Sequence, residues 1–251
     1  MIMRWILPAL SFALAVAIWE MTSRAGLVAQ YILPSPSVIA KELYVQRDLL
    51  LAHTYVTALE ILLGFALAVF LGVGLAVLLV YVPVFEPIIY PWLVVSQVIP
   101  KVAIAPLLLM WLGFGLLPKV MIAFLVAFFP VLIDTMIGLR SVEREPIYLM
   151  QSMGAKGFRS FWHVRLPTAL PHIFGGMKVA ITLAAVGAIV AEFVGSNTGL
   201  GYLLLFANGS VNAPLLFAAL VVISVLALLL YWAVSASERV FLGWHISHRS
   251  R

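Results

Sequence analysis

The feature that most constrains this chain is a series of long apolar stretches. A helix needs about 20 apolar residues to cross the hydrocarbon core of a bilayer. The 251 residues are 64% hydrophobic and only 10% charged, which is more apolar surface than a soluble domain of this length can bury. The sequence therefore predicts an all-α polytopic membrane protein with six transmembrane helices, the third interrupted by prolines. The expected spans are 5–21, 55–81, 87–111, 119–139, 176–194 and 214–235.

The distribution of basic residues predicts the orientation. Arginines and lysines are concentrated in the connection 140–171 and after the sixth span, and such segments lie in the cytoplasm by the positive-inside rule. Both termini are then cytoplasmic, and the net charge of +5 indicates membrane orientation rather than nucleic-acid binding. The segment 24–51 opposes this assignment mildly, because it contains three basic residues on the outer side. A cleaved signal peptide ending near Ser23-Arg24-Ala25 is the alternative for the first span.

We expect one domain, 1–251, without cofactors. Cysteine is absent, which excludes disulfides and thiolate metal sites. The segment 37–43 is expected to form a short amphipathic helix capped by Ser37, lying along the outer interface.

The loop 140–171 has the composition of two short helices. Residues 142–153 favour the first, and Gly154 permits a turn with positive φ. Residues 156–165 bring aromatic and basic side chains together, and Leu166-Pro167 is expected to end the second helix. Such a projection suits a groove on a soluble partner. An amphipathic connector lying on anionic lipid is the alternative.

Several motifs occur in a fixed order around this loop. Together they resemble the permeases of nitrate/sulfonate/taurine-type ABC importers, a family that includes permeases for vitamin precursors. The matching segments are Leu33-Pro34-Ser35-Pro36-Ser37, Pro100-Lys101-Val102-Ala103-Ile104-Ala105-Pro106-Leu107, Trp111-Leu112-Gly113-Phe114-Gly115, Phe129-Pro130, Gly154 with Leu166-Pro167, Ala191-Glu192 and Gly199-Leu200-Gly201-Tyr202.

The resemblance implies a type I importer permease fold in a bacterial inner membrane. The implied partners are two ATP-binding ABC subunits, a second permease copy (a homodimer or a heterodimer), an extracytoplasmic solute-binding protein and membrane lipid, with no nucleic acid. The loop would then be a cytoplasmic coupling helix contacting the ATPase, through Met153, Gly154, Ala155, Phe158, Arg159, Leu166 and Pro167. The family's Glu-Ala-Ala is replaced here by Tyr148-Leu149-Met150, and whether Glu145 substitutes for that glutamate stays open.

No ATPase activity is expected of the chain itself. It lacks the Gly-x-x-x-x-Gly-Lys-Ser/Thr loop that binds nucleotide phosphates, so it is expected to be a transport subunit and not an enzyme. An ATP-independent channel or secondary carrier is the alternative, and a membrane-embedded enzyme is a more distant one. The solute is expected to be small and polar or anionic, of the nitrate/sulfonate/taurine or vitamin-precursor class.

Charged residues inside spans are functional candidates because the bilayer makes them costly. Lys101, next to the prolines of the third span, is expected to line the path, with snorkelling as the alternative. Glu192 is either functional or bonded to the turn near Ser196. Asp134, near Arg140 in the sequence, is expected to form a salt bridge or to be an interface charge, and Glu60 is expected to lie near the outer surface. The candidate path or gate residues are Gln97, Lys101, Glu192, Gly199, Gly201 and Tyr202.

The gate residues belong to the segment 195–213, which is polar and uncharged, with a flexible surface loop as its alternative reading. Two stripes of small residues at four-residue steps predict close helix packing. They are Gly64, Ala68, Gly72 and Ala76, and Gly176, Ala180, Ala184 and Ala188.

Overall fold

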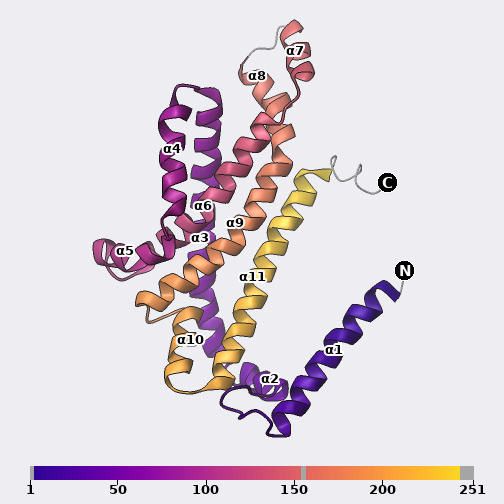
Figure 1. Cartoon of the computed structure of the whole chain (residues 1–251), viewed down its shortest axis with the longest axis vertical. Coiled ribbons are helices and arrows are strands. Elements are labelled where there is room, and N and C mark those ends of the chain that lie inside the picture. Colours follow the sequence, from indigo (N-terminus) through magenta and orange to yellow (C-terminus); the bar gives the residue numbers. More distant parts are fainter. Residues whose placement is uncertain (1–2, 154–156, 244–251) are drawn as a thin grey trace.

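The computed structural model describes residues 3–153 and 157–243, and the regular structure within these ranges is entirely helical. The chain forms a long bundle with short helices at both ends (Figure 1). The elements are α1 (Met3–Arg24), α2 (Pro36–Val45), α3 (Arg47–Tyr81), α4 (Phe85–Val98), the 3₁₀ turn η1 (Lys101–Ile104), α5 (Ala105–Leu112), α6 (Leu116–Arg140), α7 (Arg144–Ser152), α8 (Phe158–Ser160), the π-helical turn η2 (Phe161–Arg165), α9 (Leu166–Gly195), α10 (Leu200–Gly209) and α11 (Ala213–Phe241).

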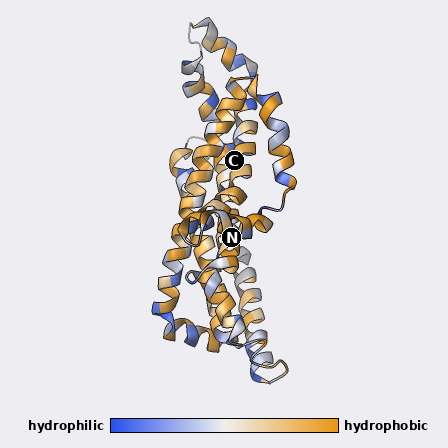
Figure 2. Cartoon of the chain, turned by 90° about the vertical axis from the view of Figure 1, so that its left-hand side faces the viewer, coloured by the Kyte–Doolittle hydropathy of each residue, from blue (hydrophilic) through white to orange (hydrophobic). Residues whose placement is uncertain are grey.

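Four of the described helices are long and apolar enough to cross a membrane. They are Arg47–Tyr81, Leu116–Arg140, Phe161–Gly195 and Ala213–Phe241. A fifth candidate is the bent pair Phe85–Val98 and Lys101–Leu112. Hydrophobic residues run along these helices, whereas hydrophilic ones gather towards the two ends of the bundle (Figure 2). The all-helical prediction is confirmed, and the count of six spans stays a prediction.

The third expected span is broken, as its prolines predicted. The helices on either side of the break are bent by 84°. The chain is extended at Ile99 and Pro100 before η1 begins. Because a proline has no N–H to donate and clashes with the preceding turn, a straight helix cannot continue through this segment.

The core of the bundle is formed by α3, α6 and α9, and the small-residue stripes make it possible. A Cβ on Gly64 would lie 2.6 Å from the Cβ of Ala123, and one on Gly176 would lie 2.8 Å from the carbonyl oxygen of Pro130. All of the stripe residues are buried. Both predicted close-packing stripes are thus confirmed, with α6 as the partner of each.

The start of α9 differs from the prediction. Leu166-Pro167 was expected to end a helix, but Phe161–Gly195 is continuous and Pro167 lies in the first turn of α9. Helical residues precede this proline, and its missing N–H is accommodated where the π-helical turn η2 passes into α9. The preceding π-helical turn lengthens the hydrogen-bonded loop where the proline enters.

The opposite end of the molecule is built from α2, α10 and the start of α11. The predicted amphipathic helix exists as α2, although its N-cap is Ser35 and not Ser37. Helix α1 extends away from the bundle and approaches α11 through Trp19, whose ring lies 6.1 Å from that of Phe217 (Figure 1).

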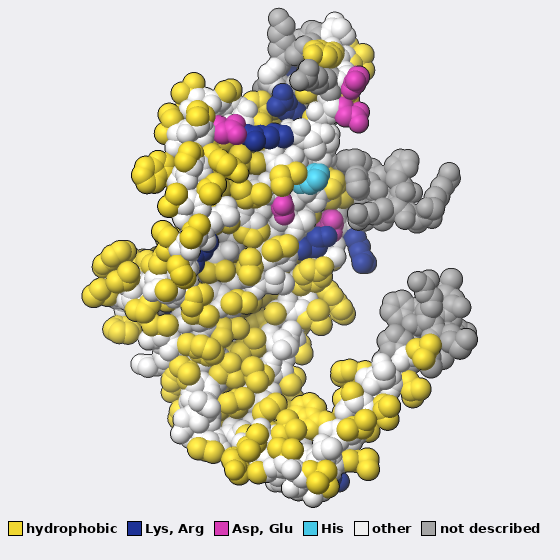
Figure 3. All heavy atoms as spheres, in the orientation of Figure 1, with side chains coloured by type: hydrophobic (Ala, Val, Ile, Leu, Met, Phe, Trp, Pro, Cys, Tyr) yellow, Lys and Arg dark blue, Asp and Glu magenta, His cyan; other side chains and the backbone are white. Residues whose placement is uncertain are grey.

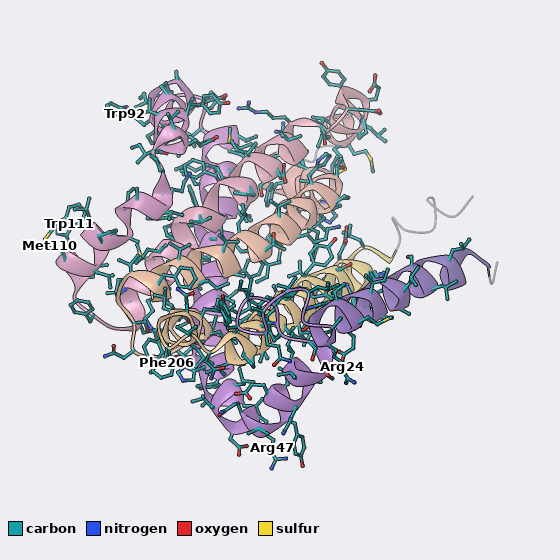
Figure 4. All side chains as sticks on the ribbon, turned by 60° about the horizontal axis from the view of Figure 1, so that its bottom comes forward. Arg24, Arg47, Trp92, Met110, Trp111 and Phe206 are labelled. Carbon is teal, nitrogen blue, oxygen red and sulfur yellow. The ribbon has the colours of Figure 1, made fainter. Side chains whose placement is uncertain are left out.

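Large apolar side chains cover much of the outer surface. Trp92, Met110, Trp111 and Phe206 are exposed and point away from the helices that hold them (Figure 4). A soluble protein would expose few such groups, but a bilayer provides an apolar surrounding for them.

Candidate functional site

A buried ion pair joins α3 to α6. The Lys119 ammonium donates to Glu60 Oε1 at 2.7 Å, and the two side chains are 6% and 0% exposed. Glu60 was expected near the outer surface of the membrane, and within the bundle its side chain is buried between α3 and α6. A charge of this kind is retained in a bundle interior only when an opposite charge compensates it.

Glu192 lies beside this pair and contacts the start of α10. Thr57 donates its hydroxyl hydrogen to Glu192 Oε1 at 2.7 Å, and the N–H of Gly201 donates to Oε2 in a short hydrogen bond. The carboxyl is 1% exposed. The structural alternative placed its partner near Ser196, whereas its partners lie on α3 and α10.

His53 and Thr57 complete the contacts with α10. The Leu200 N–H donates to Thr57 Oγ1 at 2.8 Å. His53 Nδ1 lies 2.9 Å from the nitrogen and 3.0 Å from the oxygen of Gly199, so it bonds this residue in either neutral tautomer. The His53 ring stacks on Tyr202, with centroids 5.9 Å apart. The segment after α9 is therefore a helix with a bonded start, and not the flexible loop given as its alternative.

A cavity of about 520 Å³ opens next to this cluster. Its size falls in the range of small-molecule sites. Lys119 is the only charged side chain in its lining. The lining residues are Phe114, Gly115, Lys119, Gly195, Ser196, Asn197 and Thr198.

The remaining candidate path residues lie at the bend between α4 and α5. Lys101 is half-buried, and its Nζ lies 4.5 Å from the centroid of the Phe129 ring, within cation–π distance. Gln97 is exposed near the end of α4. Ala105 of α5 packs in a cluster with Ala191, so the bend approaches the part of α9 that holds Glu192.

The opposite end of the bundle carries the loop predicted to be a coupling element. Most charged side chains visible in Figure 3 lie towards this end. Helix α7 confirms the first predicted short helix. Met153 and Arg159 are exposed, and Leu166 is half-buried like Pro167. Gly154 and Ala155 lie outside the described residues, as does the side chain of Phe158.

Aromatic and ionic contacts fix the base of this loop. The ring of Phe161 meets that of Tyr81 edge-on at 5.4 Å, and Arg165 lies 5.2 Å from the Tyr81 centroid. Arg140 bonds Glu86 at 2.6 Å. A salt bridge with Arg140 was one of the two expected roles of Asp134, but that arginine binds Glu86 at the start of α4 instead.

Lys119, Thr57 and His53 were not among the candidate site residues. A signal for two of them exists, because positions 53, 57 and 60 lie on one face of a helix and are all polar within an apolar span. Lys119 gives no such signal, since it stands alone at the start of its helix. In the described residues, no group of three or more acidic or histidine side chains could hold a metal ion.

Comparison with known proteins agrees with this arrangement. Residues 57–241 match the family described as "Binding-protein-dependent transport system inner membrane component". A probable ABC transporter permease protein of Haemophilus influenzae is 38% identical over 92% of this chain and 94% of its own length. The formylaminopyrimidine transport permease protein ThiX of Halalkalibacterium halodurans is 34% identical over 94% of this chain and 95% of its length.

A third relative has a different named solute. The riboflavin transport system permease protein RibX of Chloroflexus aurantiacus is 36% identical over 86% of this chain and 82% of its length. The family match covers well over half of the chain and includes α3 from residue 57 onward, α6, α9, α10 and the loop between α6 and α9. This chain therefore belongs to the family of binding-protein-dependent ABC transporter permeases, the multi-pass inner-membrane subunits of such transport systems.

Proposed function

We propose that this chain is the permease subunit of an ATP-driven importer, working as one of two copies above two ATP-binding subunits. A solute-binding protein delivers the solute on the outer side. ATP binding and hydrolysis in the partner subunits move the loop between α6 and α9, and this movement alternates the access of the path to the two sides of the membrane.

The observation that carries this proposal is the projection between α6 and α9. Helices α7 and α8 extend beyond the end of the bundle (Figure 1). Three large apolar side chains of this projection are 60%, 63% and 74% exposed: Tyr148 and Leu149 of α7, and Met153 directly after it. Apolar groups gathered on a segment outside the long apolar helices favour a protein partner.

Copurification tests the coupling role. Arg159→Glu reverses the charge of an exposed residue on the projection, and Gly154→Val with Phe158→Ala replaces two further residues of the proposed ATPase contact. We expect each change to remove the copurifying ATP-binding subunit from the detergent-solubilised complex. Arg47→Glu is the matched control, because it makes the same reversal on an exposed residue at the beginning of α3. A chain that purifies alone and still moves solute down its gradient would contradict the proposal and favour the channel or carrier.

The proposed path includes the bend between α4 and α5 and the start of α10. Its residues are Gln97, Lys101, Glu192, Gly199, Gly201 and Tyr202. We propose a small polar or anionic solute, because lysines are the basic groups at the bend and at the cavity. The named solutes of two relatives, formylaminopyrimidine and riboflavin, favour the vitamin-precursor class within this range.

The proposed topology has α1 as a sixth span and both termini in the cytoplasm. The chain contains no cysteine, so single introduced cysteines report sidedness without interference. We expect Asp48→Cys to react with an impermeant maleimide added to intact spheroplasts, and Ser152→Cys to react only after the membrane is opened. The reverse labelling pattern would show that the orientation in the membrane is opposite to the one proposed.

A further inference from the structure

The beginning of α10 is bonded by side chains from two other helices. Three successive backbone N–H groups, at Gly199, Leu200 and Gly201, face His53 and Thr57 of α3 and Glu192 of α9. The first N–H groups of a helix have no partner within that helix. Here two of the three N–H groups, those of Gly199 and Leu200, donate to residues that lie more than 140 positions away in the chain.

Glycines make this close approach possible. Gly199 has φ +101°, a conformation that favours glycine, and a Cβ at this position would overlap the Glu192 carboxylate. A Cβ on Gly201 would lie 2.8 Å from Glu192 Oε2. The turn between α9 and α10 is therefore shaped around one carboxyl group.

The same group connects the turn to the ion pair and to the cavity. Glu192 lies beside Glu60, which binds Lys119. Lys119 forms one wall of the cavity, and residues 195–198 of the turn form another. The position of the turn relative to α3 and α6 thus decides the shape of that cavity.

We propose that Glu192, together with Thr57 and His53, is a positioning residue that holds the start of α10 in one of two arrangements, and that transport requires these bonds to break and reform. We call the three side chains and the N–H groups of residues 199–201 the α10 latch. The inference rests on the proposed function, because it assigns to the latch the movement that opens the cavity. The latch acts through hydrogen bonding, so its function does not require a negative charge on Glu192.

Two substitutions of Glu192 separate hydrogen bonding from charge. Glu192→Gln keeps an oxygen that can accept from the Gly201 N–H, and its amide can donate to the Thr57 hydroxyl, which is free to donate to the His53 carbonyl instead. Glu192→Leu fills similar space but accepts nothing. Both remove an acidic group from a cluster with two carboxyls and one ammonium, so neither leaves a newly uncompensated charge.

The reporter is a cysteine introduced by Leu200→Cys into the cysteine-free chain. Leu200 is 0% exposed in the latched arrangement, so an impermeant maleimide reacts there only when the latch opens. Labelling rates are measured in the assembled complex without nucleotide and after trapping with ADP and vanadate. Asp48→Cys, at an exposed position at the beginning of α3, serves as the reference for the reactivity of the reagent, and Glu238→Gln is the matched control near the end of α11.

We expect Glu192→Leu to raise labelling at position 200 by about tenfold without nucleotide, because buried N–H and O–H groups lose their partners. With Glu or Gln at position 192, trapping should change the rate by about fivefold or more, and with Leu this response should disappear. Thr57→Val removes the other acceptor and should behave like Glu192→Leu, which provides a second variant if the first does not assemble.

Three results would overturn the inference. They are slow labelling in both Glu192→Leu and Thr57→Val, fast labelling in Glu192→Gln, and a nucleotide response that persists in Glu192→Leu. Failure of the proposed function looks different. In that case no ATP-binding subunit copurifies and the unsubstituted latch does not respond to nucleotide, while Glu192→Leu still labels faster.

Discussion

Replacement of Lys119 by methionine is the most direct test of the buried charge cluster. The substitution keeps the length of the side chain but leaves the Glu60 carboxyl buried without its partner. Removing one member of a buried ion pair costs about 3–5 kcal/mol. For a chain of this size each kcal/mol lowers the melting temperature by about 2–4 °C, so we expect Lys119→Met to lower it by roughly 6–20 °C.

The matched control is the second interhelical lysine–glutamate pair. The Lys178–Glu238 distance is 2.8 Å, close to the 2.7 Å of the Lys119–Glu60 pair. The side chains of Lys178 and Glu238, however, are 25% and 22% exposed. Because solvent screens such a pair, Lys178→Met should cost only about 0–1 kcal/mol. The assay is the fraction of detergent-solubilised protein that stays monodisperse after heating through a series of temperatures.

A double substitution completes the cycle. Lys119→Met combined with Glu60→Gln removes both charges, so the double variant should melt closer to the unsubstituted protein than Lys119→Met alone does. Equal losses for Lys119→Met and Lys178→Met, or a double variant whose loss is the sum of the two single losses, would refute the reasoning.

Two other substitutions test the packing and the path. Gly64→Ala places a Cβ 2.6 Å from that of Ala123, so we expect a loss of stability of about 1–3 kcal/mol in the heating assay. Gly74→Ala is the control and should be neutral or slightly stabilising, because nothing lies within 4 Å of its added Cβ. Equal effects of the two substitutions would contradict close packing of α3 on α6. Lys101→Met should raise the KM for import by about tenfold without reducing copurification of the ATP-binding subunit. Unchanged import kinetics would remove Lys101 from the path.

Much of the fold could be predicted because it follows from local patterns. The apolar stretches predicted the long helices, the prolines around position 100 predicted the broken span, and the small residues at four-residue steps predicted that α3 and α9 are closely packed. Each of these signals lies within one helix or one turn. The partner of each stripe could not be predicted, since both stripes offer the same kind of surface.

The chemistry around Glu192 could be predicted only in part. Glu192 was singled out as a charge in an apolar span, but its bonds join residues 135 positions apart in one case and nine in another. Glu60 and Lys119 are similarly separated by 59 positions. Such pairs depend on how α3, α6, α9 and α10 pack together, and single-sequence patterns contain no information on that arrangement. The prediction that Pro167 ends a helix was wrong for a different reason, because a proline is compatible with the first turn of a helix as well as with its end.

The arrangement of contacts along α9 suggests how movement passes from one end of the bundle to the other. The middle of the helix packs on α6 through Gly176 and Gly187, where added Cβ atoms would lie 2.8 Å from backbone atoms of α6. Small residues of this kind let two helix backbones approach closely, and van der Waals packing then holds the two helices together. Polar contacts occur at Arg165 near Tyr81, just before α9, at Lys178 with Glu238 of α11, and at Glu192 with the start of α10. A displacement of the loop between α6 and α9 would therefore reach the α10 latch only through a movement of α9 against its packed partners, and the hydrogen bonds of Glu192 would resist that movement.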